Sequence, residues 1–134
     1  MAPRPKPLLS MIGAAEAATG LVLAVAPSFL VELLLGAAPG TAAGTTVSRV
    51  AGVAILAIGV ACWLAREDAA GRAARGLIAA MLLYNTAVVA ILVLAWTSQG
   101  LAGVALWPVV LAHLALAVGC GAALSQEKKI GPGA

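Results

Sequence analysis

The stretch that decides the fold of this chain is VSRVAGVAILAIGVACWLA, residues 47–65. It is an unbroken apolar run that carries a single charge, Arg49. A helix rises about 1.5 Å per residue, so the run is about as long as the apolar core of a bilayer is thick, roughly 30 Å. A membrane-spanning strand is excluded because apolar and polar residues do not alternate. The stretch therefore predicts a transmembrane helix.

Three further apolar runs of similar length occupy residues 8–26, 73–96 and 101–124. The chain has 134 residues, of which 63% are hydrophobic and 10% are charged. A soluble domain is about half apolar and about a quarter charged. A small soluble fold could not cover this much apolar surface, because it leaves a large share of its residues exposed. We therefore predict an all-α integral membrane four-helix bundle, formed as one domain by residues 8–124.

The segments outside these runs have different compositions. Residues 27–36, PSFLVELLLG, are too few to cross a bilayer, but their large apolar residues share one helical face. This pattern predicts a short interfacial helix after the first span. Residues 37–46 are rich in Gly, Pro and Thr and predict a loop. Residues 1–7 and 125–134 are polar and contain Pro or Gly, so we expect disordered tails.

Lysine and arginine residues mark one side of the predicted bundle. The connections at residues 27–46 and 97–100 contain neither residue type. The positive-inside rule therefore places both termini, and the loop between the second and third spans, in the cytoplasm. This placement also accounts for the net charge of +3 without nucleic-acid binding. The basic residues that flank the spans on this side are Arg4, Lys6, Arg66, Arg72, Arg75, Lys128 and Lys129.

The first run allows a second interpretation. A basic start, an apolar stretch and the sequence Ala24-Val25-Ala26 resemble a secretory signal peptide. Cleavage of residues 1–26 would leave three helices, with the new N-terminus outside. Against this, Glu16 interrupts the apolar stretch and Pro27 directly follows the cleavage point. Four retained spans are the preferred interpretation, and cleavage stays the alternative.

Five polar side chains inside the predicted spans form the candidate site. Ionisable groups in a membrane are costly and usually face the bundle interior. Counted along the helices, Glu16 lies about 12 Å from the cytoplasmic side, and Tyr84 and Asn85 lie about 17 Å from it. His113 lies about 18 Å from the outer side, so these four residues share a depth near the midplane. Arg49 starts nearer the outer surface, where its long side chain can snorkel outward or reach toward Glu16.

These residues allow three interpretations. They can be structural, because interhelical hydrogen bonds fix the register of membrane helices. They can form a site for the polar group of a lipid-like ligand, or serve a membrane enzyme. They can also carry protons in a small proton-coupled transporter, which with four helices would need to act as an oligomer. We expect a small membrane protein that acts as a binding or accessory component.

Enzymatic chemistry of the soluble type has little support. The chain contains no Walker, GxSxG, HExxH or GxGxxG motif. Cys62 and Cys120 belong to no CxxC motif or Cys/His cluster. We therefore expect no metal and no cofactor, and we assign no catalytic residue. The expected partners are the lipid bilayer and a second copy or larger membrane complex, since the small-residue stripes Gly13/Ala17/Gly20 and Ala115/Gly119/Ala123 favour close helix packing.

Three stretches, SRVAGVAILAIGVACWLARED, LIAAMLLYN and LWPVVLAHLAL, resemble small four-helix bacterial membrane proteins of the DoxX-like and related unknown-function type. The resemblance covers about residues 46–118. It rests on an Arg-x-x-Gly at the start of the second run and on the overall layout. It implies a four-helix fold in a bacterial inner membrane. It implies no substrate and no catalytic residue.

Overall fold

The computed structural model describes residues 5–130 of the chain, and it describes side chains up to residue 126. Four of its helices are long and apolar enough to cross a membrane, and residues 5–130 contain no strand. The predicted all-α membrane bundle, with a short helix after the first span, is confirmed. The elements are α1 (Pro5–Val25), α2 (Pro27–Leu35), α3 (Ala42–Ala65), the 3-10 helix η1 (Arg66–Asp68), α4 (Arg72–Gln99) and α5 (Leu106–Ile130).

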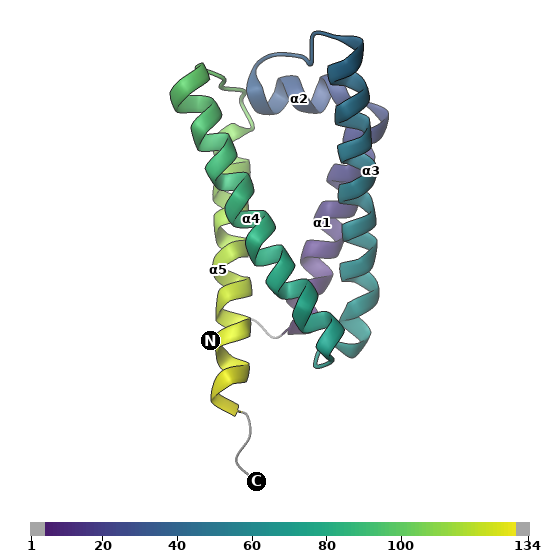
Figure 1. Cartoon of the computed structure of the whole chain (residues 1–134), viewed down its shortest axis with the longest axis vertical. Helices are drawn as coiled ribbons and strands as arrows, with labels where there is room; N and C mark the ends of the chain where they lie inside the picture. Colours follow the sequence, from purple (N-terminus) through teal and green to yellow (C-terminus); the bar gives the residue numbers. More distant parts are fainter. Residues whose placement is uncertain (1–4, 131–134) are drawn as a thin grey trace.

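The four long helices form two pairs. Helices α1 and α3 lie side by side along most of their length, and α4 packs against α5 (Figure 1). The short helix α2 lies across one end, between the pairs (Figure 1). The pairs approach each other at the opposite end, where η1 joins α3 to α4. The bundle is therefore closed by helix packing at one end and by α2 at the other.

Glycines bring the backbones of α1 and α3 into direct contact. A Cβ atom on Gly20 would lie 2.3 Å from the backbone nitrogen of Leu56, and one on Gly59 would lie 2.4 Å from that of Ala17. Gly13 and Gly52 make similar approaches. Small residues permit such close packing between membrane helices. The stripe Gly13/Ala17/Gly20 is therefore covered by α3 of the same chain and is not open to a second subunit, which corrects that part of the sequence prediction.

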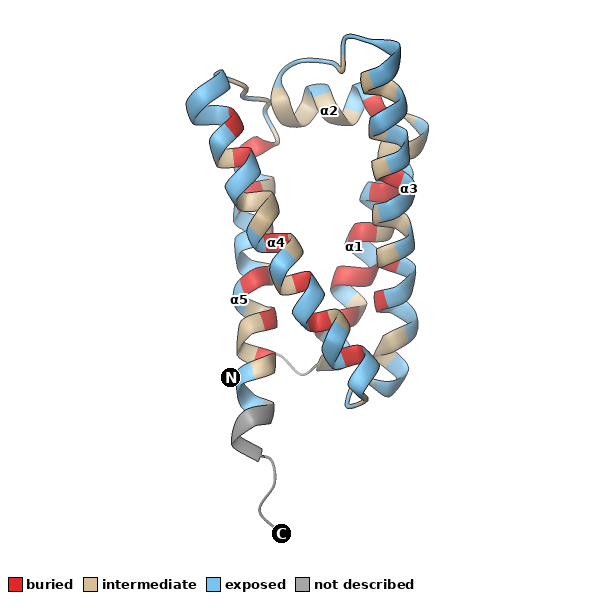
Figure 2. Ribbon diagram, in the orientation of Figure 1, coloured by how far each residue is buried: buried red, intermediate tan, exposed pale blue. Residues whose placement is uncertain are grey.

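The apolar core lies at the η1 end, where all four long helices contribute to it. Buried residues face neighbouring helices, whereas the outer faces of the helices are exposed (Figure 2). Exposed apolar faces of this kind fit a lipid environment, in which the bilayer solvates them. The residues of the core cluster are Leu8, Leu9, Ile12, Cys62, Ala74, Ile78, Met81, Cys120 and Ala123.

At the other end, α2 is tied to the α4–α5 connection through the backbone. The amide of Gly103 donates to the Leu34 carbonyl over 3.1 Å, and that of Ala105 donates to the Leu33 carbonyl over 2.9 Å. A Cβ atom on Gly103 would lie 2.2 Å from the Leu33 carbonyl oxygen. Only glycine fits this approach, so Gly103 is the residue that lets α2 dock.

The helix boundaries differ from the predicted ones where backbone contacts intervene. Helix α5 begins at Leu106, because the amides of Gly103 and Ala105 bond to α2 and the amide of Leu101 bonds to α4 instead of starting the fourth helix. Residues 5–7 and 125–130, predicted as parts of tails, belong to α1 and α5. The outermost residues of both predicted tails, 1–4 and 131–134, lie outside the described residues.

Candidate functional site

Three of the five candidate residues meet between three helices. The Tyr84 hydroxyl of α4 donates a hydrogen bond to Oε2 of Glu16 in α1, over 3.3 Å. The Tyr84 ring lies beside the imidazole of His113 in α5, with 5.9 Å between the ring centroids and 42° between the ring planes. The sequence had placed these groups at one depth, and the structure places them in one cluster.

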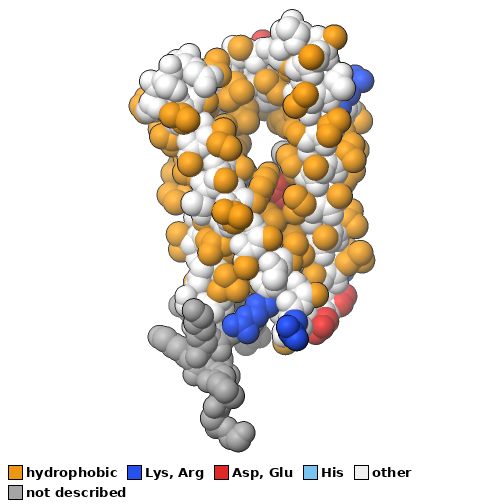
Figure 3. Space-filling view, in the orientation of Figure 1, with side chains coloured by type: hydrophobic (Ala, Val, Ile, Leu, Met, Phe, Trp, Pro, Cys, Tyr) orange, Lys and Arg blue, Asp and Glu red, His pale blue; other side chains and the backbone are white. Residues whose placement is uncertain are grey.

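The cluster lies directly next to the apolar core. Glu16 follows Ile12 by one helical turn, and Tyr84 follows Met81 by about one turn. Beyond this level the two helix pairs separate toward α2 (Figure 1). The space-filling view shows a hollow beneath α2, between the pairs (Figure 3). The polar cluster therefore lies where the packed part of the bundle gives way to its open part.

Glu16 and Asn85 are the buried polar side chains of the described chain, with exposed fractions of 3% and 0%. Asn85 follows Tyr84 directly on α4, and its Nδ2 donates to the Met81 carbonyl over 2.7 Å. Its Oδ1 is buried and accepts no hydrogen bond from any described residue. A buried acceptor without a donor costs about 1–3 kcal/mol. Asn85 is therefore a costly residue at this position unless something outside the described chain bonds to it.

His113 also carries a buried polar atom without a hydrogen-bond partner among the described residues. Its ring is half-buried, and its Nδ1 is buried without a hydrogen-bond partner among the described residues. The Val109 carbonyl, one turn earlier on α5, lies near the imidazole but does not form a hydrogen bond of acceptable geometry with Nδ1. A neutral imidazole has one donor and one acceptor nitrogen. His113 can therefore offer either function to a further group.

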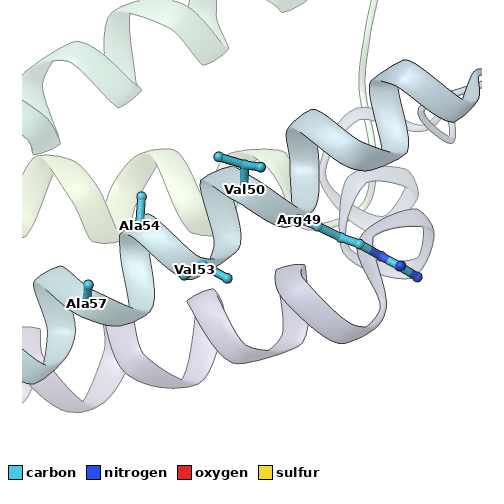
Figure 4. A pocket seen from close by; sticks show the side chains of 5 residues that line it. All are labelled: Arg49, Val50, Val53, Ala54 and Ala57. Atoms are coloured by element: carbon cyan, nitrogen blue, oxygen red, sulfur yellow. The ribbon is translucent and has the colours of Figure 1, made fainter.

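Arg49 does not join the cluster. Its side chain is exposed on α3 and forms no ion pair with Glu16. Instead it extends along the outside of the helix (Figure 4). There it flanks a shallow, almost wholly apolar groove of about 470 Å³. Of the two positions that the sequence allowed for Arg49, the structure has the outward one. The groove is lined by Arg49, Val50, Val53, Ala54 and Ala57.

Charged side chains gather at the η1 end of the bundle (Figure 3). Lys6 of α1 contacts Glu67 over 3.3 Å, and Arg66 contacts the same carboxylate over 2.9 Å. Arg66 also lies 3.6 Å above the ring of Trp63. Exposed ion pairs contribute little free energy, about 0–1 kcal/mol each. These contacts bring the start of α1 next to the connection between α3 and α4, a pairing that residue spacing alone did not indicate.

The arrangement can bind a polar group inside an apolar bundle. Glu16 lies within the part of α1 that is apolar enough to span a membrane, and no described lysine or arginine forms an ion pair with it. Charges attract each other far more strongly in such low-dielectric surroundings than in water. A ligand that bonds to Glu16 would therefore be held strongly by few contacts.

No protein-family model matches the chain, and neither a curated protein nor a solved structure matches it significantly. The likeness of residues 46–118 to DoxX-like membrane proteins stays a resemblance, from which no residue role is taken.

Proposed function

We propose that this multi-pass membrane protein is a small binding component that holds the polar group of a lipid-like molecule at the Glu16–Tyr84–His113 cluster. The observation that carries the proposal is the position of this cluster, between α1, α4 and α5 and next to the apolar core, near the level at which the helix pairs separate. A ligand with an apolar body can approach from the bilayer and place its polar group against these side chains.

A purely structural role accounts less well for the same contacts. Such a role would be supported by a Glu16 carboxylate neutralised in a packed interior, with Arg49 as its counter-ion. Arg49 instead lies on the outer face of α3. The Tyr84–Glu16 bond connects the two helix pairs, but Asn85 Oδ1 and His113 Nδ1 receive no bond from the described chain. Unsatisfied buried groups favour a bound molecule, because leaving them empty is costly.

The proposal is tested by the variant Glu16→Gln, with Glu32→Gln as the matched control. Both changes neutralise one carboxylate, but Glu32 is exposed on α2. We expect Glu16→Gln to lower the amount of co-purifying lipid-like molecule by about tenfold or more, since charge-assisted hydrogen bonds are the strong ones. Glu32→Gln should retain it. The measurement is mass spectrometry of solvent extracts from protein purified in mild detergent.

Stability measurements make the result unambiguous. A glutamine at position 16 can still accept the Tyr84 hydroxyl hydrogen bond, so unfolding in SDS should shift by no more than about 1 kcal/mol. If Glu16→Gln loses stability while its bound molecules are unchanged, the cluster is a structural element and the binding proposal is wrong.

We further propose that the membrane is a bacterial inner membrane, as the resemblance to DoxX-like proteins implies, and that the η1 end faces the cytoplasm. The support for the orientation is the distribution of charge: Lys6, Arg66, Arg72 and Arg75 lie near the η1 end, whereas Arg49 lies toward the α2 end. Retention of positive residues in the cytoplasm orients membrane proteins.

This orientation predicts the accessibility of single cysteines. In a chain with Cys62 and Cys120 replaced by alanine, we expect Ala42→Cys to react with a membrane-impermeant maleimide in intact cells. Ala70→Cys, on the connection between η1 and α4, should react only after permeabilisation. Both positions are exposed, so the two variants differ in membrane side alone. The reverse pattern would refute the orientation.

A further inference from the structure

Among the polar atoms that the cluster can present to a ligand, hydrogen-bond acceptors outnumber donors. The Tyr84 hydroxyl donates its proton to Oε2 of Glu16, and Asn85 uses its amide nitrogen on the Met81 carbonyl. The described hydrogen bond to Glu16 is accepted by Oε2, and Oδ1 of Asn85 is buried without a hydrogen-bond partner among the described residues. The Tyr84 hydroxyl and one amide hydrogen of Asn85 are thus engaged within the protein, whereas Asn85 Oδ1 is an acceptor without a donor among the described residues and His113 can serve as either.

Among the described residues, no lysine or arginine forms an ion pair with Glu16. The described ion pairs both involve Glu67 at the η1 end, and neither reaches the cluster. A carboxyl group in apolar surroundings, without a cation, either stays protonated or is balanced by a charge that comes from elsewhere. At this position the chain supplies the Glu16 carboxylate of an ion pair, and the cation comes from another molecule.

The charge of the carboxylate selects the head group of a ligand. Glu16 accepts the Tyr84 hydroxyl at Oε2, and the Tyr84 and His113 ring centroids lie 5.9 Å apart next to it. A carboxylate attracts a protonated amine and repels an anionic head group.

We infer that the ligand is a lipophilic amine: a protonated amino group on an apolar body that reaches Glu16 from the hollow between the helix pairs. The amine donates hydrogen bonds to Glu16 Oε1 and balances the carboxylate, and its apolar body occupies the hollow beneath α2 (Figure 3). This inference rests on the proposed function, because it assigns the chemical class of the molecule that the same cluster binds.

The test compares three probes that share one chain and differ in the head group: dodecylamine, dodecanol and dodecanoate. Saturable binding of each tritiated probe is measured on the full-length protein in nanodiscs, with empty nanodiscs subtracted. We expect dodecylamine to bind, with a loss of about tenfold or more in Glu16→Gln and none in Glu32→Gln. Dodecanol and dodecanoate should show no binding that depends on Glu16.

The outcomes separate the two proposals. If dodecanol or dodecanoate binds in a Glu16-dependent way and dodecylamine does not, the site stands and the amine assignment is wrong. If no probe shows Glu16-dependent binding, the binding site itself is refuted. Tyr84→Phe provides a second variant in case Glu16→Gln does not fold. It removes the competing donor and keeps the ring, so dodecylamine should bind at least as tightly as to the unchanged protein; a loss of binding would contradict the inference.

Discussion

Replacing Gly20 by leucine is expected to separate α1 from α3 and to cost about 4 kcal/mol or more of unfolding free energy. The first added carbon alone would lie 2.3 Å from the Leu56 nitrogen and 2.6 Å from the Gly52 carbonyl oxygen. These are backbone atoms, so no side-chain rotation relieves the clash. The helices must move apart, and the contact that orders the first half of the bundle is lost with them.

Gly76→Leu is the matched control for this variant. A Cβ atom on Gly76 meets nothing within 4 Å, and the residue lies in the interior of a helix in the same way as Gly20. Leucine is the better helix former by up to about 1 kcal/mol, so the control should be neutral or slightly stabilising. Unfolding in SDS, followed by tryptophan fluorescence, measures both. Equal stabilities of the two variants would show that α1 and α3 do not pack as described.

Gly103→Ala is expected to release α2 from the α4–α5 connection while the rest of the bundle stays folded. The added methyl group would lie 2.2 Å from the Leu33 carbonyl oxygen, and the two backbone hydrogen bonds of Gly103 and Ala105 cannot form at that separation. A hydrogen bond contributes about 0.5–1.5 kcal/mol net, so their joint loss should speed local opening by about tenfold or more.

Hydrogen–deuterium exchange of the protein in nanodiscs measures this opening. Faster exchange should be confined to peptides from residues 27–36 and 100–106, whereas peptides from the apolar core should keep their protection. Gly121→Ala is the control, since a Cβ atom there has no neighbour within 4 Å. Unchanged exchange in α2 would mean that the hydrogen bonds to residues 103 and 105 do not hold this helix in place.

The spans and the central cluster could be predicted because both depend on distance along a helix. Hydrophobic length identified the membrane-spanning helices, and residue counting placed Glu16, Tyr84 and His113 at one depth. Counting does not determine the direction in which a side chain points, so the sequence allows two positions for Arg49. The structure shows that the Arg49 side chain is exposed on α3.

The docking of α2 could not be predicted in the same way. It depends on backbone hydrogen bonds between residues about 70 positions apart along the chain. The sequence indicates this contact by one glycine, Gly103, which lies in a segment that resembles the start of an apolar span. For the same reason the fourth helix was expected from residue 101, whereas α5 begins at Leu106. A contact made by main-chain atoms leaves almost no side-chain pattern.

The pairing of α1 with α3, and of α4 with α5, has a consequence for biosynthesis. Each pair comes from one contiguous half of the chain, residues 5–65 and 72–130. The glycine contacts of the first pair are complete before any residue of the second pair is needed. The protein can thus enter the bilayer as two successive hairpins. The two halves can pack against each other only after the whole chain has been made. This last step forms the core and brings Glu16 to Tyr84.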